Sequence, residues 1–222
     1  MTEKYTGQAM DKRYRGEAVD VTFNLGRCIH SAVCLQRLGQ VFDTGKRPWI
    51  MADNASADEV AAAVAQCPSG ALHFERKDGG AEEPLPGENV ILARPNGPLQ
   101  LLGNLSIQGE TVAIEQETRA TLCRCGASQN KPFCDNSHRQ VGFQARGGVE
   151  QPQQLQAVAT DGQLKITPLA NGPLLLEGGY EIRDARGEVL ARGNKTALCR
   201  CGHSANKPFC DGTHRRVEFA AE

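Results

Sequence analysis

Nine cysteines and five histidines give this chain its candidate chemistry. Six of the cysteines and two of the histidines form two copies of one spacing, C-x-C-x8-C-x3-H. The ligands are Cys123, Cys125, Cys134 and His138 in the first copy and Cys199, Cys201, Cys210 and His214 in the second. Two cysteines one residue apart can chelate one metal ion from a tight turn. A cysteine and a histidine four positions apart share one face of a helical turn and can hold a second ion. Clustered cysteines in a reducing compartment indicate metal ligands more than disulfides, and an odd total argues against full pairing.

The two copies belong to a longer internal repeat. The segment 122–138 recurs at 198–214, an offset of 76 positions, and Asn96-Gly-Pro-Leu99 recurs at Asn171 with an offset of 75. The repeat therefore covers a structural unit of about 50 residues. Chance duplication of four ligands at one spacing is improbable, which disfavours simple buried cysteines. Spacing alone leaves a closed tetrahedral zinc site open, because a Cys₃His set also suits zinc.

Both copies match the pattern C-x-C-x2-S-x3-P-x-C-D-x-[ST]-H, which resembles the CDGSH iron–sulfur (NEET) family. The resemblance implies a [2Fe–2S] cluster in each copy, with Cys123 and Cys125 on one iron and Cys134 and His138 on the other. In the second copy the corresponding pairs are Cys199 with Cys201 and Cys210 with His214. Asn136 stands where the motif usually has glycine. Asparagine tolerates a positive φ better than most residues, so we expect this site to survive the change.

The histidine ligand carries the functional expectation. A neutral imidazole in place of a thiolate reduces the negative charge on its iron and raises the reduction potential. Because only deprotonated imidazole binds metal, mild acid should labilise the cluster, and His138→Cys or His214→Cys should make it more acid-stable. Arg124, Arg200, Lys131 and Lys207 could tune the potential or dock a partner, or could simply be solvated, and His203 is expected to be a solvated loop residue.

Cys28, Cys34 and Cys67 form a third candidate site. Cys28-Ile-His-Ser-Ala-Val-Cys34, followed by Cys67-Pro, resembles a single-cluster ferredoxin module over residues 18–78, with Ser31 at the middle cysteine position. Three cysteines suit a [3Fe–4S] cluster, and a [4Fe–4S] cluster is possible if Ser31, His30 or a water completes it. The alternative is a degenerate ferredoxin fold whose cysteines are small buried apolar residues.

The elements that must position these ligands follow from hydrophobic patterning. In the N-terminal segment, strands are predicted at 16–25, 47–52 and 71–76, one helix at 31–42, and a second from the Ser56–Glu59 capping box to Cys67. The stretch 78–88 has the composition of a linker. In the repeats, strands are predicted at 98–107, 111–116, 164–169, 173–182 and 188–193, with closing strands at 141–146 and 217–222. The segment between Cys125 and Cys134 is expected to be a loop, with a helical turn after Cys134.

These predictions give an α+β fold with three domains: a ferredoxin-like domain at 18–78, a first CDGSH repeat at 88–148 and a second at 152–222. We expect the β-rich repeats to pack as an intramolecular pseudo-dimer within a monomer. A net charge of −1, from 25 basic and 26 acidic residues, favours neither nucleic acid nor an anionic membrane. No apolar run reaches the roughly 20 residues that span a bilayer, and residues 1–16 lack the apolar core of a secretory signal, so a cytoplasmic protein is expected.

No phosphate-binding glycine loop, nucleophile elbow or paired-carboxylate motif is present in the sequence, so we expect no enzymatic activity. The leading hypothesis is electron transfer with a redox partner protein. The alternatives are a carrier that hands clusters to an apo-protein acceptor, a redox or pH sensor, and, less favoured, a zinc-binding interaction module.

Overall fold

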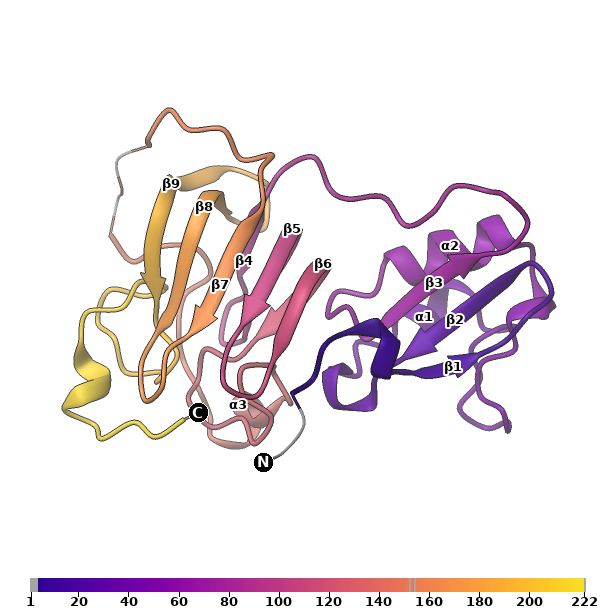
Figure 1. Ribbon diagram of the computed structural model, residues 1–222. Coiled ribbons are helices and arrows are strands. Elements are labelled where there is room, and N and C mark those ends of the chain that lie inside the picture. The colour runs from indigo at the N-terminus through magenta and orange to yellow at the C-terminus, as the bar shows by residue number, and fades with distance from the viewer. Residues whose placement is uncertain (1–3, 152, 154, 222) are drawn as a thin grey trace. The chain divides into compact units, whose positions relative to one another are not determined.

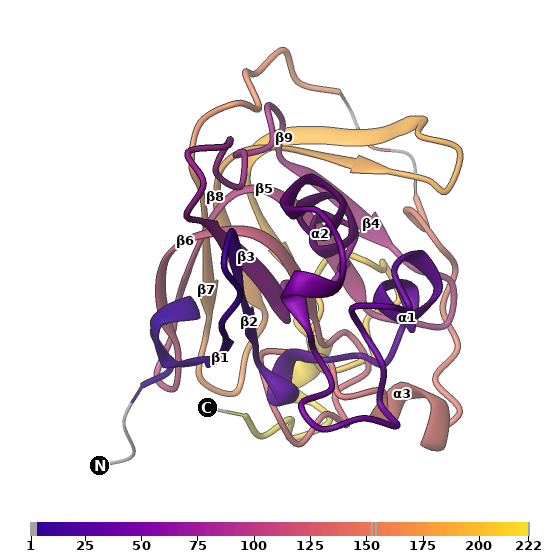
Figure 2. The same ribbon diagram turned by 90° about the vertical axis from the view of Figure 1, so that its right-hand side faces the viewer.

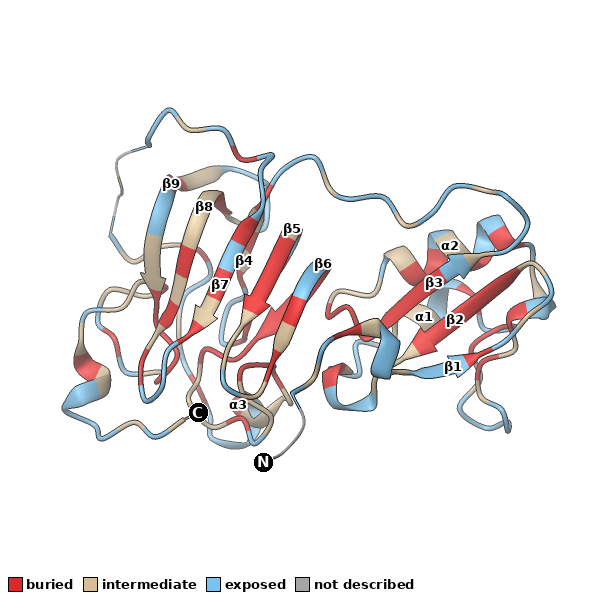
Figure 3. Ribbon diagram, viewed as in Figure 1, coloured by how far each residue is buried: buried red, intermediate tan, exposed pale blue. Residues whose placement is uncertain are grey.

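The computed structural model describes residues 4–151, 153 and 155–221. These residues form two compact units: residues 8–84 make one, and residues 4–7 together with 85–221 make the other. The segment 78–88 between them contains no helix or strand and is mostly exposed (Figure 3). No helix in the described part of the chain is long and apolar enough to cross a membrane.

The unit of residues 8–84 is a three-stranded antiparallel sheet with short helices. Its sheet has the order β1-β2-β3, and Val21 of β2 lies opposite Phe74 of β3. Helix α2 begins with the predicted capping box, in which Ser56 and Glu59 exchange side-chain and backbone hydrogen bonds, and it packs against β3 (Figure 2). The bounds are β1 Lys12–Tyr14, β2 Val19–Phe23, α1 Val33–Arg37, α2 Ala57–Ala65 and β3 Leu72–Arg76.

Two predictions for this unit were wrong. The expected strand at 47–52 is irregular and makes one isolated bridge, between Phe42 and Ile50. Aromatic packing holds this segment in place of a strand ladder, with the Trp49 ring centroid 4.8 Å from that of Phe23. The helix expected at 31–42 is confined to α1, because Leu38 turns to an extended φ of −149° and Gly39 follows it.

The unit of residues 85–221 contains both repeats in one six-stranded sheet (Figure 1). Each repeat contributes three antiparallel strands, β4-β5-β6 from the first and β7-β8-β9 from the second. Strand β4 was not predicted. The bounds are β4 Val90–Ala93, β5 Leu99–Gln108, β6 Ala113–Leu122, β7 Leu164–Pro168, β8 Leu174–Arg183 and β9 Val189–Leu198.

The two repeats exchange strand pairings. The first strand of each repeat pairs in parallel with the second strand of the other, β4 with β8 and β7 with β5. The registers are reciprocal: Ile91 lies opposite Ile182, and Ile166 lies opposite Ile107, which are the same positions under the repeat offset of 75. Buried side chains from both repeats, among them Ile91, Leu105, Ile166 and Ile182, form one shared core. The two repeats therefore depend on each other for burial of their apolar faces.

The predicted closing strands were wrong. Residues 141–146 and 217–221 form no strand, and Glu222 lies outside the described residues. Instead, the rings of Phe143 and Phe219 lie under the guanidinium groups of Arg124 and Arg200, at 5.5 and 5.4 Å from ring centroid to Cζ. The predicted helical turn after the third cysteine is the short helix α3, Ser137–Gln140, in the first repeat and a 3₁₀ turn, Thr213–Arg215, in the second.

Candidate metal centres

Each C-x-C pair lies directly after the last strand of its repeat. Strand β6 ends at Leu122, and a pair of backbone hydrogen bonds then ties the ligand loop to the strand end: Cys123 donates to Pro132 O at 2.8 Å and Cys134 donates to Thr121 O at 3.0 Å. The Ser128 hydroxyl closes the loop by donating to Phe133 O at 2.7 Å. These bonds bring the third cysteine next to the first two.

The second repeat forms the same loop with equivalent partners. Cys199 donates to Pro208 O at 2.7 Å, Cys210 donates to Ala197 O at 2.8 Å and the Ser204 hydroxyl donates to Phe209 O at 2.7 Å. Serine at the third position after the second cysteine is thus the loop's internal brace in both copies.

The aspartate after the third cysteine fixes the turn. Asp135 accepts hydrogen bonds from the backbone N–H groups of Ser137 and Gln129 at 2.9 and 2.8 Å. Asp211 accepts the equivalent bonds from Thr213 and Ala205 at 3.0 and 2.8 Å. Asn136 adopts the same turn as glycine, since its φ is +71° where the equivalent Gly212 has +84°.

The ligand atoms are spaced as a metal ion would hold them. The Sγ–Sγ distance is 3.8 Å for Cys123 and Cys125 and 3.7 Å for Cys199 and Cys201. The distance from Sγ to Nδ1 is 3.6 Å for Cys134 and His138 and 3.3 Å for Cys210 and His214. A tetrahedral ion with metal–sulfur bonds of ~2.3 Å and metal–nitrogen bonds of ~2.1 Å sets these edges at about 3.8 and 3.6 Å. Both pairs in both repeats therefore fit a metal ion.

The four ligands of each repeat meet in two pairs. Within the described residues, no three His, Cys, Asp or Glu side chains converge on a single ion position. A closed mononuclear zinc site needs four converging ligands, whereas a two-metal cluster needs two ligands for each metal.

Backbone amides surround the ligand sulfurs. Ala127 and Asn136 each donate an N–H to a sulfur of the first repeat, Cys125 and Cys134, at 3.4 Å. In the second repeat, His203 donates to Cys201 at 3.5 Å and Gly212 to Cys210 at 3.4 Å. Amide hydrogen bonds to ligand sulfurs stabilise negative charge on them and raise the reduction potential of an iron–sulfur centre.

Burial and the ligand pairing set the proton affinity of the free ligands. A hydrogen bond from the Cys125 thiol lowers the pKa of Cys123 to about 6 and correspondingly raises the pKa of Cys125. Burial raises the pKa of Cys134 to about 11 and lowers the pKa of His138. His138 is thereby held as the neutral imidazole, which is the form that binds metal.

Arg124 and Arg200 are buried structural residues and not solvated cations. Their exposed fractions are 0% and 1%. Arg124 donates to the backbone oxygens of Arg94, Gly97 and Arg146, and Arg200 donates to the equivalent oxygens of Leu169 and Gly172. Each guanidinium thus ties the ligand loop to the turn that precedes the second strand of its repeat.

The two ligand loops approach each other closely. A Cβ on Gly126 would lie 2.5 Å from Cys201 O, and a Cβ on Gly202 would lie 2.5 Å from Cys125 O. Two lysines make reciprocal contacts across the repeats: Lys131 Nζ lies 5.9 Å from the Phe219 ring centroid and Lys207 Nζ lies 6.0 Å from that of Phe143. The ligand pairs of the two repeats are therefore held on adjoining loops.

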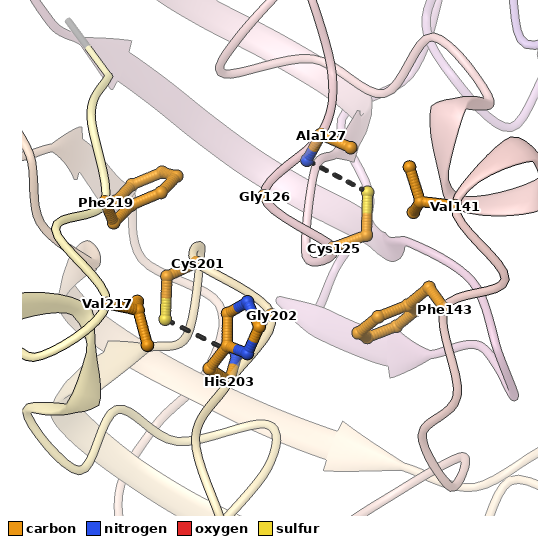
Figure 4. Close-up of a pocket in the computed structure, with 10 residues that line it drawn as sticks. All are labelled: Cys125, Gly126, Ala127, Val141, Phe143, Cys201, Gly202, His203, Val217 and Phe219. Carbon is orange, nitrogen blue, oxygen red and sulfur yellow. Dashed lines mark hydrogen bonds between the residues drawn. The ribbon is translucent and has the colours of Figure 1, made fainter.

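A pocket of about 420 Å³ opens between these loops (Figure 4). Its lining consists of five pairs of equivalent residues: Cys125 and Cys201, Gly126 and Gly202, Ala127 and His203, Val141 and Val217, Phe143 and Phe219. Four pairs are chemically identical, and only the pair of Ala127 and His203 differs. His203 is exposed, as predicted, but it faces this pocket.

The third candidate site lies in the unit of residues 8–84. Cys28, Cys34 and Cys67 line one small cavity together with Ser31 and Ser69. Burial raises the pKa of Cys28 and of Cys34, so both are protonated thiols until a metal displaces the proton. Convergence of the three cysteines on one cavity fits a cluster, and Ser31, at the middle cysteine position, lies on the same cavity.

His30 has a different position in this loop. Its Nδ1 lies 4.0 Å from the Cys28 sulfur, and its side chain lines a second, larger pocket of about 670 Å³ that also exposes Cys28 and Cys34. His30 and Ala32 have φ values of +51° and +59°, a backbone region that residues other than glycine adopt rarely. The loop is thus bent tightly around the cavity.

The sequence interpretation missed the contacts between the repeats. Gly126, Gly202, Phe143 and Phe219 were not singled out as site residues. Their identity at equivalent positions of the two copies was the available signal, because the glycine follows the second cysteine and the phenylalanine follows the histidine by five residues in both.

Comparison with known proteins agrees with this arrangement. A family model described as "Divergent 4Fe-4S mono-cluster" matches residues 14–77, and one described as "Iron-binding zinc finger CDGSH type" matches residues 96–139 and 171–215. Two relatives, each named "Uncharacterized protein YjdI", come from Escherichia coli strain K12 and Escherichia coli O157:H7. Each is 41% identical over 64 residues, which are 29% of this chain and 84% of the relative. No solved structure matches the chain. The chain belongs to the CDGSH iron–sulfur family, with two tandem CDGSH motifs preceded by a divergent, single-cluster ferredoxin-like domain.

Proposed function

We propose that this chain is a non-enzymatic electron-transfer protein with two [2Fe–2S] clusters at its Cys₃His sites. The observation that carries the proposal is the pairing of ligands two by two, with sulfur–sulfur edges of 3.8 and 3.7 Å and sulfur–nitrogen edges of 3.6 and 3.3 Å. In each repeat the C-x-C pair would hold one iron, and the third cysteine with its histidine would hold the other. When bound, such clusters accept and release single electrons.

The same proposal places a third cluster at Cys28, Cys34 and Cys67. Three thiols on one cavity suit a [3Fe–4S] cluster, and Ser31 on that cavity is the side chain best placed to complete a [4Fe–4S] cluster. The fit rests on the convergence of these side chains on one cavity.

The repeats are proposed to act as the two halves of an intramolecular pseudo-dimer. The reciprocal strand registers and the reciprocal approach of Gly126 and Gly202 support this arrangement. It keeps the two [2Fe–2S] sites on adjoining loops, which favours electron exchange between them without a second protein. Exchange with a redox partner would then complete the pathway.

Spectroscopy of anaerobically purified protein tests the proposal. We expect visible absorption, iron and acid-labile sulfide in the isolated chain, and reduced [2Fe–2S] EPR signals after dithionite. A [3Fe–4S] centre would add a signal in the oxidised sample. Cys125→Ser should remove one [2Fe–2S] signal, and Cys67→Ser should alter only the third centre. A colourless chain that contains zinc would overturn the proposal.

Cluster delivery is a second candidate, and the second repeat favours it. Cys210 and His214 are half-buried, whereas the equivalent Cys134 and His138 are buried, so the cysteine–histidine side of the second site is the more open to an acceptor. Incubation with an apo-ferredoxin separates the two functions, because a pure electron carrier would leave the acceptor without a cluster.

A further inference from the structure

We propose that the pocket between the two ligand loops is the docking site for an acidic electron-transfer protein, which inserts an apolar side chain between Phe143 and Phe219. This inference rests on the proposed electron-transfer function and adds the place and the chemistry of the partner. One docking site would serve both [2Fe–2S] sites.

The position of the pocket supports a shared site. It is lined by one ligand cysteine from each repeat, Cys125 and Cys201, which Figure 4 shows on opposite sides of the opening. A group seated there would approach each ligand set through one cysteine sulfur, that of Cys125 in the first repeat and that of Cys201 in the second. Of the three pockets described above, only this one is lined by candidate ligands of both repeats.

The lining of the pocket suits an apolar side chain. Phe143 and Val141 form one wall and Phe219 and Val217 the other (Figure 4). Val141 is 57% exposed and Val217 is 41% exposed, although each lies next to a buried or half-buried phenylalanine. A volume of about 420 Å³ accommodates an aromatic or branched aliphatic side chain. Burial of such an anchor at the centre of an interface supplies a large share of binding energy.

The surrounding charge selects an acidic partner. Lys131 and Lys207 lie on the phenylalanine rings that line the pocket, at 5.9 and 6.0 Å. The two segments 123–146 and 199–219 carry six partly or fully exposed cations against three acidic residues, while the whole chain has a net charge of −1. Two of these acids, Asp135 and Asp211, already accept hydrogen bonds from the ligand loops. The cations are Lys131, Arg139, Arg146, Lys207, Arg215 and Arg216. The two segments that form the pocket walls are thus basic on a chain of near-zero net charge, and such a local excess of positive charge steers an acidic protein toward them.

His203 makes the two sides of the docking site different and so sets the orientation of the bound partner. A pocket with five identical residue pairs would accept a partner equally well in two orientations related by the repeat. The imidazole of His203 lines the pocket where the first repeat has Ala127, and it removes this equivalence. An acidic group of the partner can accept a hydrogen bond on the His203 side only, so the partner would lie closer to the second repeat.

The reaction at this site is the transfer of one electron. The partner's reduced centre is oxidised by one electron, one metal site of this chain is reduced by one electron, and no bond forms or breaks.

The test uses a reduced plant-type [2Fe–2S] ferredoxin as the acidic probe and the whole chain as acceptor, and stopped-flow absorbance follows the electron transfer. The variant is Val141→Asp with Val217→Asp, which places two carboxylates on the rim. The matched control is Leu155→Asp, because Leu155 is an exposed apolar residue, at 52%, outside the pocket.

We expect the second-order rate constant to fall with rising ionic strength and to fall at least tenfold in the double variant, with less than a twofold change in the Leu155→Asp control. The visible spectrum should be the same in all three proteins. A rate constant that is the same at all ionic strengths and in the double variant would overturn the docking site alone. A colourless parent chain would overturn the proposed function as well. A parent dimer that Val141→Asp with Val217→Asp dissociates in sedimentation would assign the pocket to a second copy of the chain and overturn the proposal.

Discussion

For the charged residues next to the ligands, position in the sequence does not show whether the side chain is exposed. Arg124 and Arg200 follow the first cysteine of each motif and could have been surface cations, but both are buried and spend their donors on backbone oxygens. Burial lowers the pKa of Arg124 to about 10, which still leaves it charged at neutral pH. Lys131 and Lys207 are half-buried, and their ammonium groups donate to Ser128 O and Ser204 O of their own loops. Both residue types therefore brace the ligand loops.

Replacement of the buried guanidinium should destabilise the ligand loop. Arg124→Met leaves the backbone oxygens of Arg94, Gly97 and Arg146 without their donor, at a cost of about 2–4 kcal/mol. The urea midpoint followed by circular dichroism should fall accordingly. The exposed Arg139→Met serves as control and should leave the midpoint nearly unchanged. Equal midpoints for the two variants would contradict the structural role of Arg124.

The histidine ligands should set the potential of their own sites. His138→Cys adds a thiolate to the first site and should lower its reduction potential by an amount on the order of 100 mV, because the added negative charge disfavours the reduced state. An EPR-monitored redox titration measures the shift, and the unaltered second site, with His214, is the internal control. A shift of both sites together, or of neither, would contradict the assignment of His138 as a ligand.

At the scale of elements, patterning predicted most strands but not their partners. Alternating runs located β5, β7, β8 and the first half of β9, and the capping box located the start of α2. The parallel pairings β4–β8 and β5–β7 could not be predicted, because alternation shows which face is buried and not which strand lies alongside. The segments at 141–146 and 217–221 alternate like strands, but their phenylalanines are used under arginine rather than in a ladder.

The ligand loops depend on glycine where they meet. Gly126 has a φ of +83°, and a Cβ there would lie 2.5 Å from Cys201 O, so Gly126→Ala combines backbone strain with a collision against backbone. We expect a loss of about 2–4 kcal/mol in unfolding free energy. Gly142→Ala is the matched control, since Gly142 also has a positive φ, +62°, but no atom lies within 4 Å of its Cβ position. Thermal unfolding of both variants measures this difference. Equal midpoints would contradict the close approach of the loops.

Strand β8 carries a buried acid that should make the fold sensitive to acid. Glu181 is 2% exposed, and although burial raises its pKa, hydrogen bonds from Arg183 and Arg192 outweigh it and hold the pKa below the ordinary value of 4.5. A depressed folded-state pKa contributes stability above pH 4.5 that is lost as the pH falls through the folded value.

Glu181→Gln should therefore destabilise the protein by about 1–3 kcal/mol at pH 7, where two arginines lose their counter-charge. The difference from the parent chain should shrink as the pH falls from 4.5 through the folded-state pKa, because the parent carboxyl becomes protonated there as well. Urea midpoints at several pH values measure this trend. Glu177→Gln, which breaks an exposed pair with Lys195, should change little at any pH. A Glu181→Gln deficit that is constant with pH would contradict the argument.

At the scale of the whole molecule, the duplicated unit is nearly symmetric in its chemistry. Strand registers, loop hydrogen bonds, buried arginines and pocket residues recur at offsets of 75 or 76. The departures from this symmetry decide whether two identical ligand sets behave alike. Asn136 against Gly212 alters only the backbone turn, which both residues accommodate. Ala127 against His203 places a polar ring in the pocket lining of the second repeat, where the first repeat has a methyl group.

The two Cys₃His sites should therefore differ in potential, with the second site reduced first. The His203 imidazole lines the same pocket as the Cys201 sulfur, and an N–H dipole near a ligand sulfur stabilises the extra electron. His203→Ala should bring the two reduction steps closer by an amount on the order of tens of millivolts. Ala127→His should raise the reduction potential of the first site instead. This variant is the control, because it adds the histidine to the site that lacks it. Both variants are read by the same EPR-monitored titration of the full chain. If the separation between the steps survives His203→Ala, the inequivalence must arise from the more open position of Cys210 and His214, and the role given to His203 is wrong.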